Sequence, residues 1–119
     1  MPDARTYKGS CNCGAVTYEA AANLAQVISC NCSRCQRLGS LLTFVGTEQF
    51  NLLSGASAQT EYRFNTRTIA HLFCKTCGIE SFARGVGPDG SPTVAVNIRC
   101  LDNIDLSGPQ RIPFDGRSA

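Results

Sequence analysis

Cys74-Lys75-Thr76-Cys77-Gly78 is the stretch that decides the fold predicted for this chain of 119 residues. Two cysteines separated by two residues can bring both sulfurs to one metal ion, and the glycine permits a positive φ directly after the second ligand. A redox pair of the thioredoxin kind has the same spacing, but it requires a βαβ context that this sequence lacks. We therefore interpret the stretch as a zinc knuckle.

A second cysteine pair, Cys11-Asn12-Cys13, lies about sixty residues earlier and is followed by another glycine. A closed structural zinc site takes four ligands, so two such pairs complete one site. This site would tie the first strand to the middle of the domain and would contribute folding free energy. The predicted ligands of this structural zinc are Cys11, Cys13, Cys74 and Cys77.

Three further cysteines fall within six residues, in Cys30-Asn31-Cys32-Ser33-Arg34-Cys35. Three sulfurs from one segment can bind a zinc ion from one side, which leaves the fourth position to water, a substrate or a distant residue. An open position would let the metal polarise a carbonyl oxygen as a Lewis acid. The alternative is a fourth protein ligand, which would make this site structural too. We predict two zinc ions per chain, with the second one bound by Cys30, Cys32 and Cys35.

Cys100 and His71 are the remaining soft residues that could close the second site. Cys100 follows an apolar strand, and free cysteines are among the most buried residue types, so an inert core thiol is the favoured interpretation. His71 lies inside a predicted strand three residues before the knuckle. There a packing or hydrogen-bonding role is favoured over catalysis.

Composition places the chain among globular proteins of one domain, with 43% hydrophobic and 17% charged residues. No run approaches the length of a membrane span. The segment Met1–Ser10 is polar and lacks the apolar stretch of a secretory signal. We expect a cytoplasmic address, where cysteines stay reduced and favour metal binding over disulfides.

Charge argues against an electrostatic nucleic-acid partner. The formal charge is +2, and the basic residues are scattered without a run of adjacent Lys or Arg. Seven thiolate ligands and two zinc ions would change the net charge to about −1. We expect neither nucleic acid nor a membrane as a partner.

Short strands with a period of two dominate the pattern, which predicts a mostly β fold with very little helix. Turn material such as Ser54-Gly55, Phe64-Asn65-Thr66 and Gly87-Pro88-Asp89-Gly90 separates them. Single helical turns are expected from Cys32 through Gln36 to Leu38 and at Leu101–Ile104, and an irregular arm over Gly108–Ala119. The predicted strands are Ala15–Ala20, Gln26–Cys30, Leu41–Val45, Phe50–Leu53, Thr60–Phe64, Ile69–Cys74, Ser81–Arg84 and Thr93–Ile98.

These motifs resemble the glutathione-dependent formaldehyde-activating enzyme and centromere protein V family, and the similarity covers nearly the whole chain. Three ordered cysteine motifs make it specific. The matching stretches are Gly9–Val16, Cys30–Arg37, Tyr62–Thr66, Phe73–Ile79, Val96–Asp102 and Phe114–Arg117.

The resemblance implies one Mss4-like zinc-binding domain of short antiparallel strands, which we predict over residues 5–117. It implies a structural zinc on the two outer pairs and a catalytic zinc on the central cysteines. The implied activity is that of a carbon–sulfur lyase resembling S-(hydroxymethyl)glutathione synthase, with glutathione or another thiol and formaldehyde or a related small aldehyde as partners. The alternatives are a zinc-stabilised binding module without catalysis and a glutathione carrier.

Overall fold

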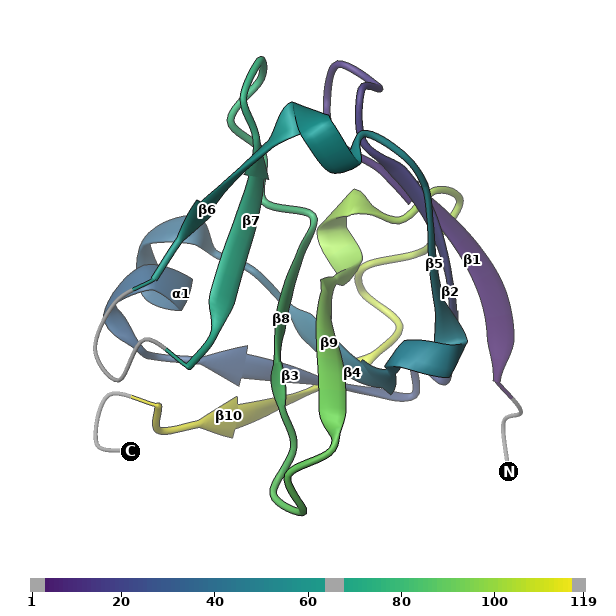
Figure 1. Cartoon of the computed structure of the whole chain (residues 1–119). Coiled ribbons are helices and arrows are strands. Elements are labelled where there is room, and N and C mark those ends of the chain that lie inside the picture. Colours follow the sequence, from purple (N-terminus) through teal and green to yellow (C-terminus); the bar gives the residue numbers. More distant parts are fainter. Residues whose placement is uncertain (1–3, 64–67, 117–119) are drawn as a thin grey trace.

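This computed structural model describes residues 4–63 and 68–116, which are organised around two β-sheets of three and seven strands. The small sheet has the strand order β1-β2-β5, and the large sheet has the order β10-β3-β4-β9-β8-β7-β6. In Figure 1 the small sheet lies on the right, whereas β10 and the short helix α1 lie on the left. The mostly β fold predicted from the sequence is confirmed.

The strands are short, and all neighbouring pairs are antiparallel except β10 with β3. Three 3₁₀ turns accompany them, η1 (Thr47–Gln49), η2 (Ala56–Ala58) and η3 (Ile98–Cys100). The strands and helix are β1 (Arg5–Ser10), β2 (Thr17–Ala22), β3 (Gln26–Cys30), α1 (Ser33–Leu38), β4 (Leu42–Gly46), β5 (Phe50–Ser54), β6 (Gln59–Tyr62), β7 (Ala70–Cys74), β8 (Phe82–Val86), β9 (Pro92–Asn97) and β10 (Gln110–Phe114).

All eight strand predictions find a counterpart within a few residues, and the helical turn after Cys32 is α1. The sulfur of Cys32 accepts a hydrogen bond from the backbone N–H of Cys35, so cysteine takes the place of a serine N-cap. Gly39, in the left-handed conformation, ends the helix. The predicted turn Phe64-Asn65-Thr66 lies outside the described residues.

Two predictions were wrong. Leu101–Ile104 forms no helix, because the helical turn comes earlier, at Ile98–Cys100, where the Asn97 side chain accepts a hydrogen bond from the backbone N–H of Arg99. The segment Gly108–Ala119 is not simply an irregular arm. Its residues Gln110–Phe114 form β10, paired in parallel with β3. The N-terminal strand Arg5–Ser10 was not predicted.

The core lies between the two sheets and is centred on three aromatic rings. Tyr18 stacks on Phe50 with ring centroids 5.2 Å apart, and Phe82 from the large sheet lies 4.6 Å from Phe50. Gly9 on β1 lies against the Tyr18 ring, where a Cβ atom would collide with it. Because one residue in two points inward along each strand, this cluster joins the sheets through one face of each.

The other face of the large sheet carries a different row of residues. His71, Ala83, Ala95 and Phe44 are neighbours in register across β7, β8, β9 and β4. Side chains at paired positions lie on the same face of a sheet, so these four line up side by side. The two alanines in the middle of the row leave room above the sheet.

Candidate metal centres

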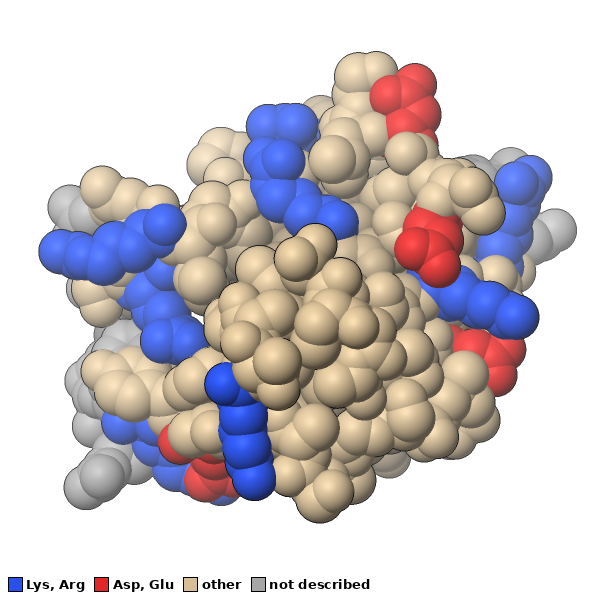
Figure 2. Space-filling model, turned by 90° about the horizontal axis from the view of Figure 1, so that it is seen from above, with Lys and Arg blue, Asp and Glu red and all other residues tan. Residues whose placement is uncertain are grey.

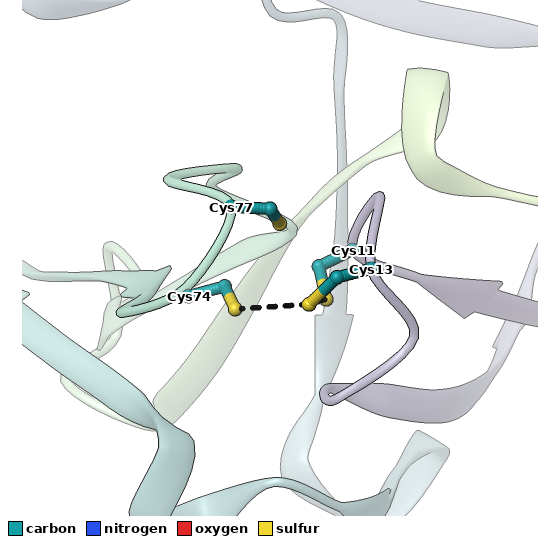
Figure 3. A group of neighbouring side chains, drawn as sticks. All are labelled: Cys11, Cys13, Cys74 and Cys77. Atoms are coloured by element: carbon teal, nitrogen blue, oxygen red, sulfur yellow. Dashed lines mark hydrogen bonds between the residues drawn. The ribbon is translucent and has the colours of Figure 1, made fainter.

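Cys11, Cys13, Cys74 and Cys77 form the first candidate centre, with all four sulfurs within 4.8 Å of one another. The Sγ atoms of Cys11 and Cys13 are 3.7 Å apart, and those of Cys13 and Cys74 are 3.6 Å apart. Figure 3 shows one pair from the loop after β1 facing the other pair at the end of β7. The structure therefore brings together the two distant pairs that the sequence analysis assigned to one site.

The two loops that carry these cysteine pairs direct backbone N–H groups at the sulfurs. Val16 donates to Cys11 Sγ at 3.3 Å, and Thr76 donates to Cys74 Sγ at 3.4 Å. A hydrogen bond from the backbone N–H of Ile79 lowers the pKa of Cys77 to about 6. The predicted positive φ is present, with 79° at Gly78. This loop therefore favours the thiolate form, which is the form that binds metal.

Cys30, Cys32 and Cys35 form the second candidate centre, again with sulfurs within 4.8 Å of one another. Cys30 ends β3, Cys32 is the N-cap of α1, and Cys35 lies in its first turn. The backbone N–H of Cys32 donates to Cys30 Sγ, and that of Cys35 donates to Cys32 Sγ, both at 3.4 Å. Burial raises the pKa of Cys35 to about 12. Among the described residues, no fourth metal-ligating side chain joins this group.

The segment after β10 covers this second centre. The backbone N–H of Asn31 donates to the carbonyl oxygen of Phe114 at 3.1 Å, and the Asn31 side chain donates to Asp115 at 3.0 Å. Gly116 then lies directly against the sulfur of Cys30, where a Cβ atom would collide with that sulfur. Only glycine fits this approach without displacing the sulfur.

A cavity of about 430 Å³ opens beside the three sulfurs. Its floor is the row His71, Ala83, Ala95 and Phe44 of the large sheet, and Glu80 adds a carboxylate. The rest of its wall is apolar and consists of Ile28, Leu42, Ile69 and Phe114, together with Gly116.

His71 on this wall is linked to a chain of charged groups that runs through Glu80 to Arg34 outside the cavity. Arg34 donates through Nε and Nη2 to Glu80 Oε1, at 2.8 and 2.7 Å. His71 Nδ1 lies 3.3 Å from the second oxygen, Glu80 Oε2. A carboxylate oxygen can only accept, so this hydrogen bond forms when the imidazole carries a proton on Nδ1. The hydrogen-bonding role that the sequence analysis favoured for His71 is therefore present, in its contact with Glu80, and His71 also lines the cavity.

Glu80 was missed by sequence reasoning. It is 8% exposed and lies in the link between the knuckle and β8. No motif or periodic pattern in the sequence marks that position as part of a site.

Cys100 lies away from the second centre. It lines a different surface hollow, together with Cys11 and Leu101, and its Sγ lies 3.9 Å from the carbonyl oxygen of Glu80. Burial raises its pKa, which agrees with the interpretation of an inert thiol.

Figure 2 shows the face seen from above, where Lys and Arg lie at separate positions around a broad area without charged side chains. Among the described residues, the one α-helix has six residues, so none is long and apolar enough to cross a membrane.

Comparison with known proteins extends these observations. Residues 6–114 match the family described as "Glutathione-dependent formaldehyde-activating enzyme". The chain is also similar to a crystal structure of a Rhodobacter sphaeroides protein, a structural-genomics target, with 31% identity and a TM-score of 0.76. This similarity covers 87% of the present chain and 97% of the other.

Proposed function

The chain belongs to the glutathione-dependent formaldehyde-activating enzyme family, and from this premise we propose that it is a zinc-dependent carbon–sulfur lyase. Its reaction would be the reversible addition of a thiol, such as glutathione, to formaldehyde or a related small aldehyde. The observation that carries the proposal is the cavity that holds the three sulfurs of Cys30, Cys32 and Cys35 at one end and His71 on its wall. A metal site that opens into a cavity fits a catalytic role better than a structural one.

The residues of both centres fit zinc. Sulfur-only ligand sets favour Zn²⁺ over Mg²⁺ or Ca²⁺, which prefer oxygen ligands. Backbone N–H groups point at Cys11, Cys30 and Cys32, as expected where thiolate charge must be stabilised. Because Gly116 has no side chain, it can lie close to Cys30 without displacing the sulfur. We assign a structural zinc to Cys11, Cys13, Cys74 and Cys77, and a second zinc to Cys30, Cys32 and Cys35.

Zinc at the second centre would supply a Lewis acid that favours a thiolate over a thiol and polarises a carbonyl oxygen. The protein's own groups then handle the proton. His71, oriented by Glu80, can accept the proton that the thiol loses and return it to the oxygen of the adduct. Arg34 is a positioning residue, because it touches Glu80 and holds its carboxylate in place. The largely apolar lining lowers the local dielectric, which would strengthen each of these interactions.

An exchange experiment tests this function. Formaldehyde labelled with ¹³C is mixed with glutathione, and the exchange rate between free and adduct carbon is measured by NMR with and without catalytic amounts of the zinc-loaded protein. We expect faster exchange with wild type and near-background exchange with Cys32→Ala. An unchanged rate with the fully loaded wild-type protein would reject the catalytic function.

The same samples distinguish the two alternatives. Calorimetric binding of glutathione without faster exchange would identify a carrier. A salt-sensitive shift of DNA at micromolar protein would identify a binding module and would contradict the expectation that nucleic acid is not a partner. The cytoplasmic address and the single domain over residues 5–117 also stay predictions, supported by the eight free cysteines and by the family match over residues 6–114.

A further inference from the structure

The cavity beside Cys30, Cys32 and Cys35 is larger and more apolar than formaldehyde requires. Formaldehyde has two non-hydrogen atoms, whereas a cavity of about 430 Å³ falls in the size range that holds ligands of many atoms. Among the described lining residues there is no Lys or Arg, so the wall offers no partner for the two carboxylates of glutathione. Its size and its largely apolar lining indicate that the aldehyde partner is larger than formaldehyde.

The cavity is built by the sequence of the large sheet. Ala83 and Ala95 are paired on β8 and β9, between His71 on one side and Phe44 on the other. Larger side chains at these two positions would fill the space above the sheet. The opposite face of the same strands carries Phe82, Val94 and Val96, which are packed into the core at no more than 1% exposure. On β8 and β9, the small side chains Ala83 and Ala95 therefore lie on the cavity face, and large ones lie on the core face.

The mouth of the cavity is also apolar. Phe44, Ile69 and Phe114 are exposed by 54%, 47% and 52%, although each lines the cavity. Phe44, Ile69 and Ala95 also line a second hollow of about 870 Å³ over the ends of β8 and β9, whose lining includes Glu48 and Asp89. The three residues that the two hollows share are all apolar.

The polar groups of the cavity fall into two sets, the three sulfurs within 4.8 Å of one another and His71 with Glu80 at 3.3 Å, and Arg34, between Cys32 and Cys35 in the sequence, donates to Glu80. Among the described lining residues these polar groups are the three cysteines, His71 and Glu80. This is the arrangement needed for a molecule with one polar, reactive end and an apolar remainder. A carbonyl group would lie among the polar groups, and its carbon chain would contact the alanines and Phe44.

We propose that the aldehyde partner of this protein carries an apolar chain of about six carbon atoms or more, which the cavity binds. The proposal rests on the proposed function. In the reaction the thiol S–H bond breaks and an S–C bond forms at the carbonyl carbon. The electron pair of the C=O π bond moves to oxygen, and the proton released by the thiol ends on that oxygen. The product is a hemithioacetal, and no oxidant or reductant is needed.

Binding of unreactive carbonyl analogues tests the proposal without turnover. Acetamide, butanamide, hexanamide and octanamide are titrated into the zinc-loaded protein, and affinities are measured by ligand-observed NMR. We expect affinity to rise about fourfold for each added methylene group, or about sixteenfold from butanamide to hexanamide. Equal affinities along the series would overturn the proposal.

Variants locate the binding. Ala95→Leu fills the cavity floor and should remove the gain with chain length, whereas Ala21→Leu is the matched control. Ala21 is a half-buried alanine on β2 in the small sheet, so this variant should keep the gain. A gain that survives in Ala95→Leu would reject the assignment to this cavity. If Ala95→Leu does not fold, nuclear Overhauser contacts between hexanamide and the Ala83 and Ala95 methyl groups of wild type decide, and their absence would reject it.

The outcomes separate this proposal from the proposed function. Formaldehyde exchange that is catalysed while the amide affinities stay equal rejects the apolar chain alone. A clear gain with chain length without any catalysed exchange, for formaldehyde or for hexanal, rejects the catalytic function alone.

Discussion

His71 and Cys74 lie three residues apart on β7 and serve different sites. Cys74 belongs to the four-sulfur centre, whereas His71 lines the cavity of the three-sulfur centre. Residues separated by three along a strand point to opposite faces. Phe73, two residues from His71, and Tyr62, which pairs with His71 from β6, lie on the same face as His71. Both of their rings lie near the Arg34 guanidinium. One strand therefore separates the two centres.

The first prediction concerns the division of labour between the centres. Cys32→Ala should lose one zinc ion per chain and stay folded, because α1 and β3 keep their other contacts. Cys77→Ala should lose at least about 4 kcal/mol of stability and aggregate or unfold, since a structural zinc contributes directly to folding. Elemental analysis and thermal unfolding of both variants measure this. Equal unfolding of the two would show that the roles are wrongly divided.

The second prediction concerns Gly116. The Cβ of Gly116→Ala would collide with Cys30 Sγ, so we expect metal affinity at the second centre to fall about 10- to 100-fold. Competition with a chromophoric chelator measures it. Gly108→Ala is the control, because its Cβ would meet a single neighbour, the Asp105 carbonyl oxygen at 3.4 Å. Identical affinities in the two variants would contradict the close approach.

The third prediction concerns the buried carboxylate. Glu80→Gln removes the charge that Arg34 and His71 contact, and we expect a loss of about 1 to 3 kcal/mol in unfolding free energy. It should also change the pH dependence of catalysed exchange, because the partner that orients His71 is weakened. The control is Glu61→Gln, from an exposed ion pair with Arg63. This control should leave stability unchanged within error, and the idea fails if the two variants behave alike.

The fourth prediction concerns the contact between the sheets. Phe82→Ala should reduce the free energy of unfolding by about 3 to 5 kcal/mol, since its ring packs against both Tyr18 and Phe50. Denaturant titration measures this loss. Val86→Ala, on the same strand but 63% exposed, should change it by less than about 0.5 kcal/mol. A loss below about 1 kcal/mol for Phe82→Ala would mean that the sheets are held together elsewhere.

The two sulfur clusters could be predicted from the sequence because their seven cysteines occur in three tight local groups. The strands could be predicted because their side chains alternate with a period of two. Alternation in β2 is an example, where Tyr18, Ala20 and Ala22 are buried. Both signals are local, so a single sequence reveals them.

The cavity and its polar chain could not be predicted, because they depend on residues that meet only in the folded sheet. Ala83 and Ala95 are twelve positions apart and form a hollow through their pairing across β8 and β9. β10 was missed for a related reason. It contains Pro113, which is tolerated because β10 is an edge strand of the large sheet.

The pairing of β10 with β3 sets the order in which the chain can complete its sites. Gln110 pairs with Gln26, so this contact joins segments near opposite ends of the chain. During synthesis the N-terminal part of a chain is available first, so a contact between segments far apart in the sequence forms after the local ones. All four cysteines of the first centre have emerged once Cys77 has, whereas Phe114 and Gly116, which cover Cys30, emerge later. A nascent chain can therefore bring its four-sulfur centre together before the three-sulfur centre is covered.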